Sequence, residues 1–137
     1  MRPALPLAAS ALALAACAAN FGEAALEAGH AERSLSALPP RQALTCLRRD
    51  LDRGPVPPTR ESRGEVGRSL VGVLAMDPRV WLYRVTVSPA PDGGAWIDAE
   101  AADPGYPMSD WWQGGLHLFT EDRIAARLAE AAAACAG

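Results

Sequence analysis

An apolar leader opens this chain and decides how much of it can take part in a fold. The first residues, MRPALPLAASALALAAC, contain one positive charge at Arg2, followed by an apolar stretch from Ala4 to Ala16. A permanent membrane-spanning helix needs about 20 apolar residues, so this stretch is too short to be one. A positive region, a short apolar region and small residues at its end are typical of a secretory signal peptide. We therefore expect residues 1–16 to be removed and the fold to be built from the remainder.

The end of the leader carries a second motif, Leu14-Ala15-Ala16-Cys17. An aliphatic residue, two small residues and a cysteine in this order resemble the lipobox of bacterial lipoproteins. The resemblance implies that the Cys17 thiol is acylated, for example with palmitate, and becomes the first residue of a membrane-anchored mature chain. Because Ala18 rather than an aspartate follows, the resemblance favours the outer membrane, on its periplasmic side. The alternative is cleavage after Ala18, which would release a soluble periplasmic protein.

The composition argues against one class of partner. All 13 basic residues are arginines, and they are outnumbered by 16 acidic residues, for a formal net charge of −3. Nucleic-acid binding needs a basic surface that neutralises phosphates. We therefore expect no DNA or RNA partner. A length of 137 residues is enough for one domain.

Cys46 and Cys135 remain once Cys17 is set aside for the lipid. A pair of cysteines in an oxidising compartment predicts a disulfide. The bond would close a loop of about 90 residues, for which the chain-entropy model gives up to about 4.6 kcal/mol of stabilisation. Two separate buried thiols are the alternative. Two cysteines and two distant histidines do not form a ligand cluster, so we expect no metal and no cofactor.

The chain after the leader divides into two parts. Residues 17–38 are expected to be the lipidated N-terminus and a tether, within which a short helix could form, and residues 39–137 the globular domain. A helix is predicted to begin at Pro39-Pro40 and to end at Gly54, because proline is tolerated in a first helical turn. Its apolar stripe consists of Leu44, Leu47 and Leu51. Residues 54–64 are expected to be a loop.

The following segments read as strands and a closing helix. Strands are predicted over residues 66–76, 80–87, 95–101 and, more briefly, 116–119. In the second strand one face is expected to hold Trp81, Tyr83, Val85 and Val87. In the strand over residues 95–101, one face is expected to be buried and to hold Ile97, Ala99 and Ala101. The other face is expected to be solvated and to hold Trp96, Asp98 and Glu100. Thr120 is expected to cap a final helix whose inner face consists of Ile124, Leu128, Ala131 and Cys135.

This order of elements predicts an α+β domain. An antiparallel sheet of three or four strands would carry an N-terminal and a C-terminal helix packed on one face, and the disulfide would join the two helices.

Two pairs of residues could carry hydrolytic chemistry on envelope polymers. His117 lies shortly after Asp110, and Asp98 and Glu100 share one strand face as glycosidase carboxylates do. A simpler explanation exists for both pairs. His117 would be an ordinary residue of a short strand, and Asp98 and Glu100 would simply be solvated. We therefore predict no catalytic site.

Adjacent tryptophans indicate a binding surface. Trp111 and Trp112 cannot both point inward from an extended segment, so one of them should be exposed. Together with Tyr106 and Asp110 it would suit a protein contact or stacking on a cell-wall glycan. We expect a non-enzymatic envelope lipoprotein that binds such a partner. The alternatives are a periplasmic hydrolase and a protein like the small lipoproteins that inhibit lysozyme, which share the anchor and a disulfide.

Overall fold

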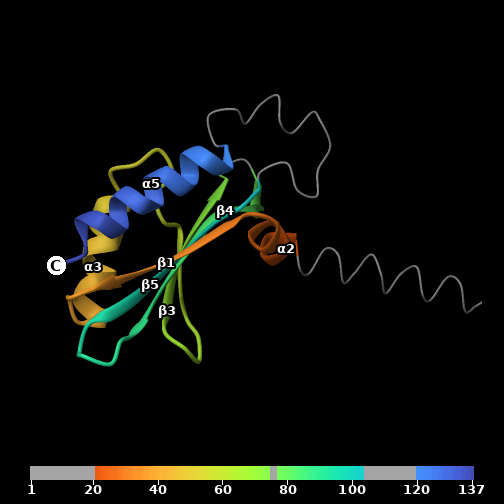
Figure 1. Ribbon diagram of the computed structural model, residues 1–137. Helices are drawn as coiled ribbons and strands as arrows, with labels where there is room; N and C mark the ends of the chain where they lie inside the picture. Colours follow the sequence, from red (N-terminus) through yellow and green to blue (C-terminus); the bar gives the residue numbers. More distant parts are fainter. Residues whose placement is uncertain (1–20, 75–76, 104–119) are drawn as a thin grey trace, which may run out of the picture.

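A five-stranded antiparallel sheet forms the centre of the fold (Figure 1). The computed structural model describes residues 21–74, 77–103 and 120–137. The strand order is β1-β5-β4-β3-β2, so that β1 and β2 are the two edges. In chain order the elements are α2 (Phe21–Ala28), β1 (His30–Ser36), α3 (Pro40–Leu51), β2 (Arg60–Arg63), β3 (Arg68–Leu74), β4 (Asp77–Pro89), β5 (Ala95–Ala101) and α5 (Glu121–Ala134).

The predicted α+β class is confirmed, but the sheet is larger than expected. It has five strands rather than three or four, and the described part of the chain contains three helices rather than two. Both additional strands are edges: β1 lies within residues 17–38, for which the sequence predicts a tether, and β2 lies within the expected loop 54–64. Their sequences, HAERSLS and RESR, lack apolar alternation because their side chains are mostly exposed. The strand expected over residues 116–119 lies outside the described residues.

Helices α3 and α5 cover one face of the sheet and bury the main core against it (Figure 1). Both predicted stripes are confirmed. Leu44, Leu47 and Leu51 are buried on α3, and Ile124, Leu128 and Ala131 are buried on α5. The Thr120 hydroxyl caps α5 by accepting a hydrogen bond from the Arg123 backbone N–H at 3.4 Å. The sheet contributes residues such as Leu70, Leu82, Val85 and Ile97 to this core.

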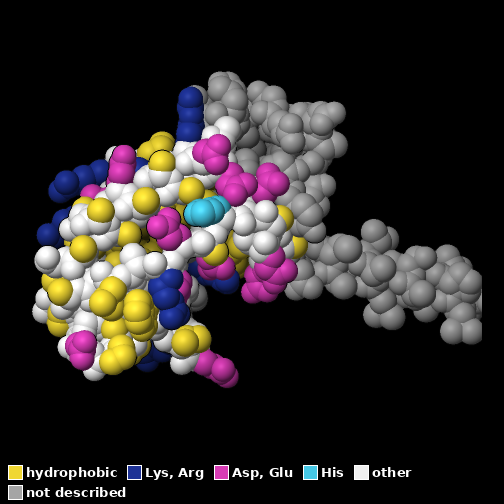
Figure 2. Space-filling model, in the orientation of Figure 1, with side chains coloured by type: hydrophobic (Ala, Val, Ile, Leu, Met, Phe, Trp, Pro, Cys, Tyr) yellow, Lys and Arg dark blue, Asp and Glu magenta, His cyan; other side chains and the backbone are white. Residues whose placement is uncertain are grey.

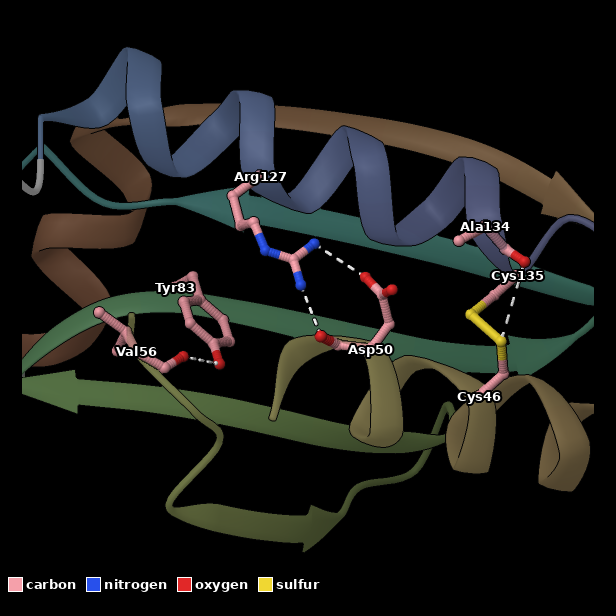
Figure 3. A network of polar contacts seen from close by, with 7 residues as sticks. All are labelled: Cys46, Asp50, Val56, Tyr83, Arg127, Ala134 and Cys135. Carbon is pink, nitrogen blue, oxygen red and sulfur yellow. Dashed lines mark hydrogen bonds and ion pairs between the residues drawn. A yellow bond between two sulfur atoms is a disulfide. The ribbon is translucent and has the colours of Figure 1, made fainter. Parts of the chain in front are cut away.

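The predicted disulfide joins the two covering helices. Cys46 on α3 and Cys135 at the end of α5 are bonded, with their Cα atoms 5.8 Å apart (Figure 3). Cys135 is fully buried in the main core. One turn further along α3, Asp50 contacts Arg127 of α5 through a 2.8 Å ion pair. The two helices are therefore connected at two successive points on their shared side.

Helix α2 packs against the opposite face, at one end of the sheet. Ala25 and Leu26 form a small second core with Ala102, and Trp81 packs against it. A bulge places Trp81 there: Gly72 pairs with Tyr83 but Val73 pairs with Trp81, so the residue between them on β4 has no partner. The expectation that Trp81 and Tyr83 share a face is therefore wrong. The alternation predicted for β5 is confirmed at Ile97 and Ala101, which are buried, while Trp96, Asp98 and Glu100 are half-buried. Ala99 is also half-buried, although it packs against the main core as predicted.

Candidate functional site

The structure describes only part of the set of residues singled out from the sequence. Asp98 and Glu100 lie on β5, on the face of the sheet that α3 and α5 leave open. The remaining candidates lie outside the described residues: Cys17, Tyr106, Asp110, Trp111, Trp112 and His117.

Each of the two described carboxylates is held by an arginine from a neighbouring strand. Arg33 of β1 lies opposite Asp98 and donates two hydrogen bonds to it, at 2.7 and 3.1 Å. Arg84 of β4 lies opposite Glu100 and donates two to it, at 2.6 and 3.0 Å. Hydrogen bonding to these carboxylates raises the pKa of both guanidinium groups above its ordinary value.

This pairing does not suit general acid catalysis. Both oxygens of each carboxylate already accept a hydrogen bond from an arginine, so neither carboxyl is free to exchange a proton with a substrate. Asp98 and Glu100 therefore act as partners of Arg33 and Arg84, and the four side chains form a polar surface rather than an acid–base pair.

A hollow of about 460 Å³ lies over this polar surface. On one side of it Arg33 stacks over the indole of Trp96, with the guanidinium carbon 5.0 Å from the ring centroid. That distance is within the range of a cation–π contact. The hollow is lined by residues of β1, β4 and β5 together with Val66: Ala31, Glu32, Arg33, Val66, Thr86, Ser88, Asp98, Ala99 and Glu100.

A second hollow, of about 190 Å³, lies on the other side of β1, between this strand and α5. It is a groove lined mainly by small apolar side chains, and its residues include His30, Glu32, Ser34, Leu35, Leu128 and several alanines of α5. Figure 2 faces this side of the molecule and shows hydrophobic side chains along α5, with acidic side chains gathered toward α2. The groove is closed at one end, where the Ala37 N–H donates to the Ala136 carbonyl at 2.7 Å.

Strand β1 therefore has a hollow on each of its faces, and it is an edge of the sheet that no other described strand pairs with on its outer side. All seven of its residues pair with β5 in an uninterrupted register. The opposite edge, β2, is only four residues long and entirely polar, and its Glu61 pairs with Arg48 and Arg68. Short, charged edge strands resist pairing with other chains, whereas long and regular ones invite it. We take β1 and its two hollows as the candidate functional site.

Sequence reasoning missed this site because β1 carries almost no strand signal. Its segment, HAERSLS, contains one large apolar residue, Leu35, and follows a glycine. The feature that identifies β1 as a strand is its pairing with β5, in which Arg33 contacts Asp98, 65 residues further along the chain. Such a long-range contact cannot be read from local periodicity.

Within the described ranges there is no group of three or more histidine, cysteine, aspartate or glutamate side chains able to hold a metal ion. None of the described helices is both long enough and apolar enough to cross a membrane. In comparisons with known proteins, no protein-family model matches the chain and no curated protein matches it in sequence.

Proposed function

We propose that this protein is a lipid-anchored binding module of the bacterial cell envelope, held at Cys17 in the outer membrane on its periplasmic side. The disulfide supports this proposal, because it uses two of the chain's three cysteines and leaves Cys17, at the end of the leader, for the lipid. Disulfides persist in oxidising compartments such as the periplasm.

The observation that carries a binding role is an edge strand, β1, which is unpaired on its outer side within the described ranges and has a hollow on each face. The hollows along β1 hold side chains that are suited to recognition, and the described carboxylates on the open face are engaged by arginines. A protein partner is favoured over a glycan. Arg33 already covers the Trp96 ring, so a sugar would have to displace it in order to stack there.

A lipid on Cys17 would hold the domain close to the bilayer. Three residues separate Cys17 from the start of α2 at Phe21. An extended chain spans at most about 3.6 Å per residue, so α2 would lie within about 14 Å of the lipidated residue. The partner is therefore expected at the membrane surface.

Metabolic labelling tests the anchor. In a bacterial host fed an alkyne fatty acid, the wild-type protein should become labelled and sediment with membranes. Cys17→Ser should abolish the label, whereas the doubly substituted Cys46→Ser/Cys135→Ser protein should keep it. Mass spectrometry that finds an unmodified Cys17 still joined to residues 1–16 would overturn the proposal.

Site-specific cross-linking tests the binding surface. A photo-reactive amino acid placed at Leu35 on β1 should yield a discrete adduct in intact cells. The matched control at Ser62, which is exposed on the opposite edge strand, should not. Equal adducts from both positions, or none from Leu35, would contradict binding along β1.

A further inference from the structure

We infer that β1 binds its partner by strand addition, taking an extended peptide segment as a new edge strand of the sheet. This inference rests on the proposed binding function and names the class of partner. The segment would place a basic side chain opposite Glu32 and small apolar side chains along the groove beside α5.

The backbone of β1 has hydrogen-bonding groups available for such a strand. The Ala102 N–H donates to the Leu82 carbonyl at 2.9 Å, which fixes the alternation of hydrogen bonds across β5. The register between β5 and β1 continues the same alternation, so every second residue of β1 bonds to β5 and the residues between them do not. The backbone N–H and C=O groups of Ala31, Arg33 and Leu35 therefore point away from β5, toward the outer side of β1. Three successive donor and acceptor pairs can therefore receive an added strand.

Both faces of an added strand would find apolar contacts. Leu35 lies opposite Trp96 of β5, so its side chain is on the open face although the residue also borders the groove, and it is 56% exposed. Within the described residues the other large hydrophobic side chain left exposed is Val66. On the covered face the groove offers the small alanines of α5, including Ala129, Ala132 and Ala133. In strand addition the backbone supplies affinity, and pockets for alternate side chains supply specificity.

The charge of the groove selects a basic side chain. His30 and Glu32 are the titratable groups that line it, and the Glu32 carboxylate contacts His30 Nε2 at 3.8 Å. Across the strands Glu32 faces Ala99, in contrast to Asp98, which faces Arg33. Glu32 is 65% exposed at its side chain and is therefore available to a cation on the next strand. Opposite charges directly across two strands stabilise their pairing.

A peptide fused to the C-terminus provides a direct test. Gly137 lies against Ala37, just beyond the end of β1, so a short linker can return a segment antiparallel to this strand. The probe is a six-residue glycine–serine linker followed by Ser-Val-Val-Thr-Arg-Val-Thr, which places its arginine opposite Glu32. The matched control probe carries glutamate in place of that arginine. Both are fused to a mature chain that carries Cys17→Ser and no lipid.

Amide hydrogen exchange measured by NMR reports occupancy of the edge. With the arginine probe, the amides of Ala31, Arg33 and Leu35 should exchange at least tenfold more slowly than in the unfused chain. The glutamate probe should slow them less than threefold, and Glu32→Gln should remove the difference between the probes. Ala31→Pro, which removes one outward N–H, should abolish the protection at Arg33 and Leu35.

Unchanged exchange with the arginine probe, or equal protection by both probes, would overturn strand addition. So would protection that rises with protein concentration without any probe, since a second copy would then occupy the edge. Because the probes work without the lipid, this result is independent of the anchor. If the probes bind but Leu35 yields no cross-link in cells, the proposed envelope function fails and the peptide-binding edge stands.

Discussion

Ser36 ties together segments that are distant in the chain. Its side chain is fully buried at the end of β1. The hydroxyl donates to the Cys135 carbonyl at 2.5 Å and accepts from the Leu38 backbone N–H at 3.1 Å. One hydroxyl thus satisfies a carbonyl at the end of α5 and an N–H just before α3. A buried polar group of this kind stabilises only while both of its partners are in place.

Ser36→Ala should therefore destabilise the protein more than expected for the removal of a single oxygen atom. It leaves two backbone groups without a partner, and we expect the free energy of unfolding in urea to fall by about 1–3 kcal/mol. Ser34→Ala is the matched control, because Ser34 lies on the same strand face and lines the groove. Its effect should stay within about 0.5 kcal/mol, as for most surface substitutions. Equal losses for the two variants would contradict this role of Ser36.

Tyr83 gives the protein a dependence on alkaline pH. Its ring is buried and its hydroxyl donates to the Val56 carbonyl at 2.7 Å (Figure 3). Burial, followed by the negative charge of Asp52, raises the pKa of Tyr83 well above the ordinary value of 10.0. The unfolded chain then loses this proton more readily than the folded one. The stability linked to Tyr83 is complete below pH 10.0 and declines as the pH rises above that value.

Urea unfolding between pH 8.5 and 11.5 should show this decline clearly. The chain has no lysine, and arginine stays protonated throughout that range, so tyrosine dominates the titration. Tyr83→Phe should flatten the pH dependence, although it also removes the hydrogen bond to Val56. Tyr106→Phe serves as the control and should retain the decline. A wild-type profile that stays flat above pH 10.0 would contradict the burial argument.

The elements that the sequence predicts well are those with one buried, apolar face. α3, α5 and β5 show clear apolar periodicity because each packs one side against the main core. The edges β1 and β2 are exposed on most of their residues, so their patterns carry no such information. The bulge that separates Trp81 from Tyr83 is also invisible locally, since it arises from pairing with β3. The candidate site was missed for the same reason, because it is built on an edge strand.

A truncation series tests whether residues 17–38 belong to the folded unit. A chain that begins at residue 39 lacks β1 and α2, so β5 loses one of its two partner strands and Trp81 loses the helix that packs against it. We expect no cooperative urea transition from this chain. A chain that begins at Phe21 should unfold with the midpoint of the mature protein. Equal midpoints for the two truncated chains would instead support a tether over residues 17–38.

The covalent loop and the binding edge occupy different parts of the molecule. The loop closed by the disulfide runs from the middle of α3 to the end of α5 and includes β2, β3, β4 and β5. β1 and α2 precede Cys46 and lie outside this loop. They are held by pairing with β5, by the Ser36 hydroxyl and by packing against Trp81. The proposed binding strand thus rests on a cross-linked scaffold without being part of it.

Reduction of the Cys46–Cys135 bond should destabilise the whole domain. The two cysteines are 89 residues apart, and reduction restores the conformational freedom of that long segment in the unfolded chain. We expect the free energy of unfolding to fall by about 2–4 kcal/mol, the usual range for a native disulfide. Urea unfolding with and without a phosphine reductant measures this directly, and reduction removes neither sulfur atom.

Asp50→Asn is the matched control for the helix–helix contact itself. It keeps the disulfide but weakens the adjacent ion pair with Arg127. In that pair the Asp50 side chain is 23% exposed and the Arg127 side chain is 25% exposed. Arg127 also donates to the Asp50 backbone carbonyl, a bond that this substitution leaves in place. The loss should therefore stay near 1 kcal/mol, at the upper end for partly exposed ion pairs. If reduction costs no more than this substitution, the disulfide contributes only a local contact and the unfolded chain is not restrained by its long loop.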